Sequence, residues 1–215
     1  MSQSIADTLQ VRWLGRVDYQ TTWQQMRDYT DNRDQNSPDQ LWLLEHHPVF
    51  TQGQAGKAEH VLAAGDIPVV QTDRGGQVTY HGPGQLIGYF LIDLKRKNIG
   101  IRPLVTGIEQ SLVEYLNQQG INAAADPNAP GVYIDGSKIA SLGLRVRKFR
   151  SYHGLGLNVN TDLEPFLRIN PCGYQGMQMT RMSDFGLTQS VEQAGTELAP
   201  VIAKLLDYTH IQWDK

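Results

Sequence analysis

Cysteine is almost absent from this 215-residue sequence, which contains only Cys172. A single cysteine cannot form a disulfide within the chain, and it cannot build a cysteine-rich zinc site. The first seven residues also lack the positive charge and the apolar segment of a secretory signal peptide. These absences predict a cytoplasmic protein.

Long hydrophobic runs and a strong excess of charge are absent as well. The densest apolar stretch, residues 86–94, is interrupted by Gly88 and Asp93 and is less than half as long as a membrane span. The formal net charge is −3, from 19 Lys and Arg against 22 Asp and Glu. Proteins that hold nucleic acid through its phosphates are usually basic. We therefore expect neither a membrane nor a nucleic-acid partner.

Short motifs for nucleotides and metals are also lacking. No Gly-Lys-Ser/Thr follows a glycine at phosphate-loop spacing, and the glycines at 154 and 156 lack the third glycine of a dinucleotide fingerprint. His153 and His210 have no second ligand at the spacing of a metal site. The sequence gives no support for ATP, a dinucleotide or a metal as cofactor.

The composition is that of a globular protein, with 40% hydrophobic and 19% charged residues. The length fits a single domain over residues 1–215. Apolar periodicity and capping residues predict helices from Asp18 to about Arg33, from Pro103 to Gly120 and from Ser190 to Leu206. Strands are expected over 9–17, 41–44, 67–72, 77–81, 86–94, 132–134, 138–146 and 152–159. This order predicts an α/β (α+β type) fold, with a mixed sheet flanked by helices.

The segment from residue 74 to 85, Arg-Gly-Gly-Gln-Val-Thr-Tyr-His-Gly-Pro-Gly-Gln, is rich in both glycine and hydrogen-bonding side chains. Glycine lets backbone N–H groups lie against a ligand, which the polar side chains can orient. A hairpin with elaborate turns would have the same composition. The two interpretations are equally favoured by the spacing alone.

Cys172 lies in Asn170-Pro171-Cys172-Gly173, a sequence typical of a sharp turn with an accessible thiol. A lone cysteine can equally be a small buried apolar residue. A thiol becomes nucleophilic when a nearby cation favours the thiolate. Lys138 is a candidate for this cation, because it starts an apolar strand. If its amine lies about 4 Å from the thiolate, the attraction between them would be about 4 kcal/mol at an effective dielectric of 20. The alternative is a surface lysine after the Asp135-Gly136 turn.

Four basic residues and no acidic ones lie between Arg145 and Arg150. Residues 74–150 contain ten basic and five acidic residues, a net charge of +5. This stretch could be an exposed edge strand kept from aggregating by its charge. The charge asymmetry also suits docking of an acidic protein partner.

Four segments of the sequence resemble the octanoyltransferases (lipoyl(octanoyl) transferases) of protein lipoylation. They are residues 74–85, the pair Pro130-Gly131-Val132-Tyr133 and Lys138-Ile139-Ala140-Ser141-Leu142-Gly143, His153-Gly154-Leu155-Gly156-Leu157-Asn158-Val159-Asn160, and Asn170-Pro171-Cys172-Gly173-Tyr174. They occur in the family order, and the resemblance runs from about Leu9 to Asp184. It implies the fold shared by biotin and lipoate ligases, with the acyl group in a tunnel.

The resemblance also implies site residues and substrates. Cys172 would carry an acyl-thioester, and Lys138 would lower its pKa. The residues implied to contact substrate are Arg74, Gly75, Gly76, Gln77, Val78, Thr79, Tyr80, His81, Ser141, Leu142, Gly143, Gly154, Leu155 and Gly156.

The implied donor is octanoyl-acyl carrier protein, and no cofactor is needed, since the phosphopantetheine belongs to the carrier. The implied acceptors are lipoyl domains of 2-oxo acid dehydrogenase acyltransferase subunits and the glycine cleavage H protein. Three alternatives remain at this point: an ATP-dependent lipoate–protein ligase, a cysteine hydrolase pairing Cys172 with His81 or His153, and a non-catalytic binding protein.

Overall fold

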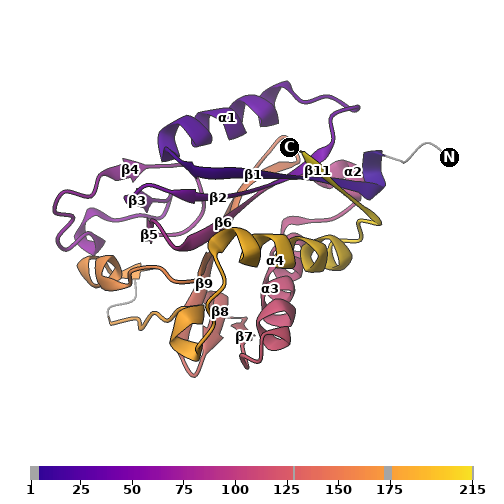
Figure 1. Ribbon diagram of the computed structural model, residues 1–215. Coiled ribbons are helices and arrows are strands. Elements are labelled where there is room, and N and C mark those ends of the chain that lie inside the picture. Colours follow the sequence, from indigo (N-terminus) through magenta and orange to yellow (C-terminus); the bar gives the residue numbers. More distant parts are fainter. Residues whose placement is uncertain (1–4, 128, 172–175, 215) are drawn as a thin grey trace.

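Two sheets organise the computed structural model, which describes residues 5–127, 129–171 and 176–214 (Figure 1). The large sheet has the order β11 (His210–Asp214), β1 (Thr8–Val17), β2 (Asp39–His46), β6 (Gln85–Leu91), β10 (Arg150–Asn158), β9 (Ser137–Arg147), β8 (Ala129–Ile134) and β7 (Ala124–Asp126). Strand β1 pairs in parallel with β2 and with β11, and all other pairs in this sheet are antiparallel. The sheet is therefore mixed, as the sequence predicted.

The small sheet has the order β4 (Val69–Gln71), β3 (Val49–Gln52) and β5 (Val78–His81). Strand β3 runs parallel to β4 and antiparallel to β5. The connection from β4 to β5 contains the first part of the glycine-rich segment, residues 74–77, so this sheet presents that part toward β9 and β10.

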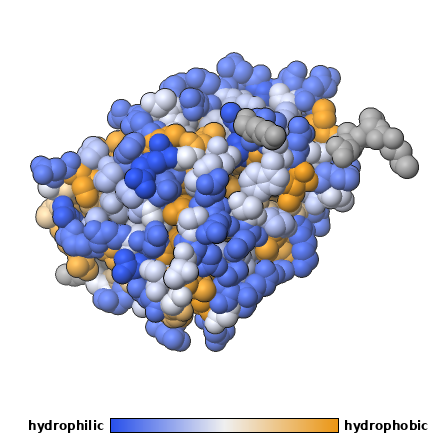
Figure 2. All heavy atoms as spheres, in the orientation of Figure 1, coloured by the Kyte–Doolittle hydropathy of each residue, from blue (hydrophilic) through white to orange (hydrophobic). Residues whose placement is uncertain are grey.

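Helices cover both faces of the large sheet. Figure 1 shows α1 (Tyr19–Asn32) over one face and α3 (Ile101–Gln118) with α4 (Val191–Leu205) over the other. A short helix, α2 (Leu94–Lys97), follows β6. None of the described helices is both long and apolar enough to cross a membrane. The face shown in Figure 2 is largely hydrophilic, with its hydrophobic atoms in separate patches.

Strand β2 shows why the sheet is buried on both faces. Leu41 and Leu43 join the apolar cluster under α3 and α4, whereas Trp42 and Leu44 pack with Met26 of α1. Successive side chains of a strand point to opposite faces. The continuous apolar run in the sequence therefore reflects a central strand covered by helices on both sides.

The helix ends follow the capping residues of the sequence. The Asp18 carboxylate accepts a hydrogen bond of 2.8 Å from the backbone N–H of Thr21 at the start of α1. Ser190 and Gln193 form a reciprocal capping box at the start of α4. Both arrangements satisfy N–H groups that the first helical turn leaves unpaired. The predicted starts of these two helices are confirmed, while α3 begins at Ile101, two residues before Pro103.

Several predicted strand boundaries were wrong. Residues 86–94 were expected to form one strand, but β6 ends at Leu91, because Asp93 caps α2 by accepting a hydrogen bond from the Arg96 backbone N–H. The strands β3, β7 and β11 were not predicted. Each has five residues or fewer, too few for a clear alternation of apolar and polar residues.

Strand β9 is an inner strand of the sheet, but its basic end has a strand neighbour on one side only, which fits the interpretation of that stretch as an edge. It lies between β10 and β8 in the sheet. Its pairing with β8, however, ends at Ala140, whereas its pairing with β10 continues to Arg147. Residues 141–147 therefore have a neighbouring strand on one side only, and this stretch forms part of the site.

Candidate active site

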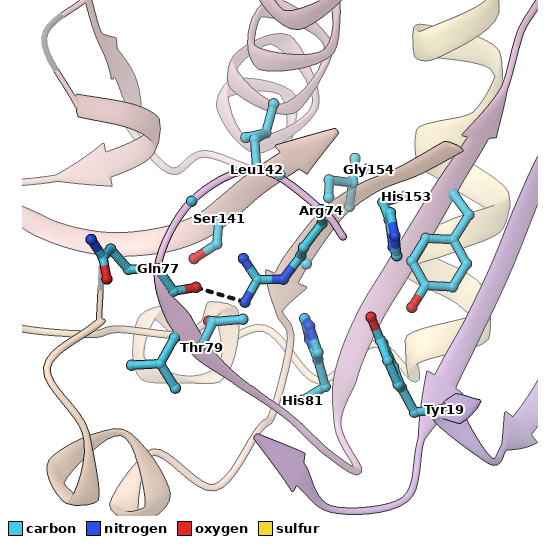
Figure 3. Close-up of a pocket in the computed structure, with 15 residues that line it drawn as sticks. Tyr19, Arg74, Gln77, Thr79, His81, Ser141, Leu142, His153 and Gly154 are labelled. Atoms are coloured by element: carbon cyan, nitrogen blue, oxygen red, sulfur yellow. Dashed lines mark hydrogen bonds between the residues drawn. The ribbon is translucent and has the colours of Figure 1, made fainter. Parts of the chain in front are cut away.

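A pocket lies where β9 and β10 of the large sheet face the glycine-rich segment before β5 (Figure 3). Its empty volume is about 490 Å³, counting the space at its open mouth. The lining comes from distant parts of the chain: Tyr19, Arg74, Gly76, Gln77, Val78, Thr79, His81, Tyr89, Ser141, Leu142, Gly143, His153, Gly154, Leu155 and Gly156.

Glycine is required in the pocket walls because two backbones approach closely there. A Cβ added at Gly154 would collide with the carbonyl oxygen of Gly88. A Cβ added at Gly143 would lie 3.1 Å from the carbonyl oxygen of Gly75. The backbone N–H of Gly75 also donates to the Leu144 carbonyl over 3.1 Å, which fastens the glycine-rich segment across β9.

Arg74 holds the glycine-rich segment in shape. Its guanidinium donates to the Thr51 side chain over 3.0 Å and to the carbonyl oxygens of Gly75 and Gln77 over 2.8 Å each. Figure 3 shows the bond to Gln77 crossing the middle of the pocket wall. These bonds fix the loop between β4 and β5, so one function of Arg74 is to position the residues that line the pocket.

Aromatic rings gather at one side of the pocket. We call Tyr19, His46, His81, Tyr89 and His153 the ring wall. Neighbouring ring centroids lie 5.2 Å apart for Tyr19 and His46, 6.2 Å for Tyr19 and His81, 5.8 Å for His46 and Tyr89, and 6.0 Å for Tyr89 and His153. Figure 3 shows Tyr19, His81 and His153 on the side of the pocket opposite Gln77.

Two histidines of the ring wall have defined tautomers. His46 Nδ1 lies 3.0 Å from the Val17 carbonyl, which can only accept, so Nδ1 carries the proton and the Tyr89 hydroxyl donates to Nε2 over 2.7 Å. His81 Nδ1 lies 2.7 Å from Gln85 Oε1 and donates to it. Burial lowers the pKa of His46 to about 4. Burial, reinforced by His46, lowers the pKa of His81 to about 3. Both rings are neutral near pH 7.

Asp73 supports the ring wall from behind. Its carboxylate accepts hydrogen bonds from His153 Nε2 over 3.0 Å, from Trp23 Nε1 over 2.9 Å and from the Tyr152 hydroxyl. Burial opposes ionisation of Asp73, but the bonds from His153 and Tyr152 outweigh it and hold the pKa of this carboxyl well below its ordinary value. Burial lowers the pKa of His153, although Asp73 opposes this shift. His153 also has a φ of +60°, which is uncommon for a residue other than glycine.

Lys138 is buried, with 1% of its surface exposed, so the interpretation as a surface lysine was wrong. Its Nζ lies 5.3 Å from the centroid of the Tyr133 ring, within the range of a cation–π contact. A Cβ at Gly131 would lie 3.1 Å from this Nζ and 2.5 Å from Cε, so glycine leaves room for the amine. The Lys138 backbone bonds to the Gln178 carbonyl and the Thr180 N–H over 2.8 and 3.0 Å.

The structure brings together most of the residues expected to contact substrate. Twelve of the fourteen line the pocket. Gly75 and Tyr80 do not; the Tyr80 ring instead packs between Phe50 and Phe166, at 5.6 and 5.5 Å. Cys172 lies outside the described residues. The roles of these residues in substrate binding and catalysis stay predictions.

Sequence reasoning missed Tyr19 and Tyr89 as lining residues and did not place His46 beside the site. No spacing signal links these residues, since they come from α1, β6 and β2. The positive φ of His153 was equally invisible in the sequence. Within residues 5–127, 129–171 and 176–214, no three His, Cys, Asp or Glu side chains are grouped to hold a metal ion.

Comparisons with known proteins identify the family of this chain. The sequence pattern of the family described as lipoyl protein ligase A/B catalytic domain matches residues 18–202. The octanoyltransferase of Shewanella amazonensis is 59% identical over 206 residues, which cover 96% of this chain and 95% of that protein. The octanoyltransferase of Vibrio campbellii is 58% identical over 205 residues, 95% of this chain and 93% of that protein.

Solved structures share the fold at low sequence identity. Lipoate-protein ligase A bound with ATP superposes with a TM-score of 0.78 and 15% identity, covering 96% of this chain and 87% of that one. Biotin protein ligase from Aquifex aeolicus superposes with a TM-score of 0.57 and 16% identity, covering 92% of this chain and 68% of that one. The mixed sheet flanked by helices is therefore the arrangement of these ligases.

Proposed function

This chain belongs to the lipoyl protein ligase A/B catalytic domain family, and we propose that it moves an octanoyl group from octanoyl-acyl carrier protein, through a thioester on Cys172, to a lipoyl-domain lysine. It is an acyltransferase, as are its octanoyltransferase relatives at 58–59% identity over nearly the whole chain. The proposal adds to this activity the identity of the donor, an acyl carrier protein, and the thioester intermediate on Cys172.

The observation that carries the proposal is the position of Lys138. It is a buried lysine on the same strand as Ser141, Leu142 and Gly143, which line the pocket. A lysine amine beside a reacting thiol suits proton transfer to and from that thiol.

In the first step, Lys138 takes the proton of the Cys172 thiol. The thiolate attacks the carbonyl carbon of the octanoyl thioester, and the tetrahedral intermediate collapses with cleavage of the bond to the carrier's sulfur. Lys138 returns the proton to that sulfur, so the carrier leaves as a thiol. Backbone N–H groups near Leu142 and Gly143 would stabilise the oxyanion.

In the second step, the amine of the acceptor lysine loses a proton to Lys138 and attacks the Cys172 thioester. An amide forms, the bond to Cys172 breaks, and Lys138 returns the proton to the sulfur. One thioester replaces another in the first step, and a more stable amide replaces a thioester in the second. The two reaction steps therefore need no ATP and no resident cofactor.

The proposed acceptors are lipoyl domains of 2-oxo acid dehydrogenase acyltransferase subunits and the glycine cleavage H protein. In each case the reacting lysine is presented by a folded protein, which fits a pocket with an open mouth. The relatives' name, octanoyltransferase, supports octanoate as the group transferred, and an acyl carrier protein would supply it as an activated thioester.

Reconstitution with purified components tests the proposal. Octanoyl-acyl carrier protein and an unmodified lipoyl domain should yield an octanoylated lipoyl domain, measured by intact mass, in the absence of ATP. Free octanoate with ATP should yield none. Product formed only from octanoate and ATP would instead identify an ATP-dependent ligase.

A further inference from the structure

The ring wall occupies a defined position relative to Lys138. Along β9 and β10, Gly156 pairs with Ser141 and His153 pairs with Leu144, while Tyr89 of β6 pairs with Gly154. On β9, Lys138 precedes Ser141, whereas the partners of His153 and Gly154 follow it. The rings of His153 and Tyr89 therefore line the pocket at the levels of β9 that lie farther from Lys138.

The spacing along β9 between Ser141 and the rings is close to the length of an acyl chain of eight carbons. Tyr89 is level with Gly143 and His153 with Leu144, two and three residues from Ser141, which is about 7 to 10 Å along a strand. An extended octanoyl group contains seven C–C bonds of about 1.5 Å, and its zigzag length is roughly 9 Å. A chain that starts beside Ser141 would bring its methyl group to the level of His153 and Tyr89.

Each ring is fixed by a hydrogen bond to a residue outside the pocket. The Tyr19 hydroxyl donates to Thr72 Oγ1 over 3.1 Å. The other four bonds join Tyr89 to His46, His46 to Val17, His81 to Gln85 and His153 to Asp73, all between 2.7 and 3.0 Å. All five side chains are at least nine-tenths buried. A longer chain could displace the rings only by breaking these bonds.

We infer that the ring wall is the chain-length stop of the pocket, with Tyr89 and His153 as the residues that the terminal methyl group meets. This inference rests on the proposed acyl transfer. Two further methylene groups would have to enter space that the rings fill, and packed interiors accommodate added methylenes poorly. The enzyme should therefore select medium-chain acyl donors and reject longer ones.

The wild-type protein provides the first test. Acyl-enzyme formation would be followed by intact mass with hexanoyl, octanoyl, decanoyl and dodecanoyl thioesters of pantetheine, which remove any selection made by the carrier protein. We expect the rate to rise from six to eight carbons and to fall at least tenfold by twelve. Equal rates with eight and twelve carbons would overturn the inference. No adduct with any chain would refute the proposed function instead.

Variants then locate the stop. Tyr89→Ala should raise the decanoyl-to-octanoyl rate ratio about tenfold, and Tyr19→Leu, on a different element, should change it in the same direction. Tyr89→Phe keeps the ring but removes its bond to His46, and it should raise the ratio less than Tyr89→Ala does. Tyr115→Ala removes a buried tyrosine on the α3 side of the sheet and controls for general destabilisation.

The outcomes are decisive even if one variant folds poorly. A ratio that rises in Tyr89→Ala or Tyr19→Leu, but not in Tyr115→Ala, supports the stop. A ratio that stays at the wild-type value in every folded variant, or rises equally in Tyr115→Ala, contradicts it.

Discussion

Lys138 is the residue whose environment bears most directly on the chemistry. Its amine contacts the face of Tyr133, and its side chain fits only because residue 131 is glycine. The sequence indicated that a lysine at the start of an apolar strand was unusual. It could not indicate burial, because an exposed lysine after an Asp-Gly turn has the same local pattern.

Replacing Lys138 with methionine should make the Cys172 thiol less reactive. Lys138→Met keeps much of the side-chain volume but removes the amine that favours the thiolate. We expect the rate of alkylation by iodoacetamide at pH 7 to fall about tenfold or more. Lys148→Met, at an exposed position, is the matched control. An unchanged alkylation rate in Lys138→Met would show that Lys138 does not activate the Cys172 thiol.

At the scale of elements, the central strands and long helices were predictable because their apolar patterns and caps are local features. The glycines of residues 74–76, 141–143 and 154–156 also indicated close backbone approaches. The ring wall was not predictable. Tyr19 at the start of α1 and Tyr89 within β6 have the pattern of ordinary core residues, and only the pairing of β2, β6 and β10 brings their rings together.

The hairpin of β9 and β10 carries the basic stretch, and its basic side chains have different partners in the structure. Arg147 forms an ion pair of 3.0 Å with Asp31 of α1, whereas Arg145 bonds to Gln54 over 2.7 Å. Lys148 and Phe149 form the exposed tip, with φ values of +51° and +60°. Lys148 also lies 3.9 Å from Asp31. We expect the positive charge of this hairpin to dock the acidic carrier protein.

Charge reversal on this hairpin should weaken use of the carrier-borne donor. We expect Arg145→Glu with Arg147→Glu to raise the KM for octanoyl-acyl carrier protein several-fold and to flatten its dependence on salt, because the surface charges steer association. Kinetics with octanoyl-pantetheine should change little. An equal loss with both donors would mean that the hairpin supports the pocket and does not dock the carrier.

For the whole molecule, two buried histidines and the partly buried Asp73 link stability to pH in the same direction. His46 and His81 have folded pKa values of about 4 and 3, below the ordinary value of about 6.5. The unfolded chain therefore binds more protons than the folded one as the pH falls from about 6.5. Asp73, whose pKa is depressed, stabilises the folded state above its ordinary pKa and loses this contribution at lower pH.

The free energy of unfolding should consequently decrease between pH 7 and pH 4. Each of the two histidines should account for about 3 kcal/mol of the loss at pH 4. Urea unfolding at a series of pH values measures the slope, and His46→Gln should make it shallower. A stability that is constant over this range would show that the ring wall is not neutral and buried as described.

The central claim is that Cys172 carries the octanoyl group, and intact-mass measurement tests it most directly. After incubation with octanoyl-acyl carrier protein and no acceptor, the protein should gain the mass of one octanoyl group. Hydroxylamine should remove the group as expected for a thioester, and Cys172→Ala should gain none. A hydroxylamine-sensitive adduct that persists in Cys172→Ala, or a wild-type protein that transfers octanoate without ever forming an adduct, would contradict the account.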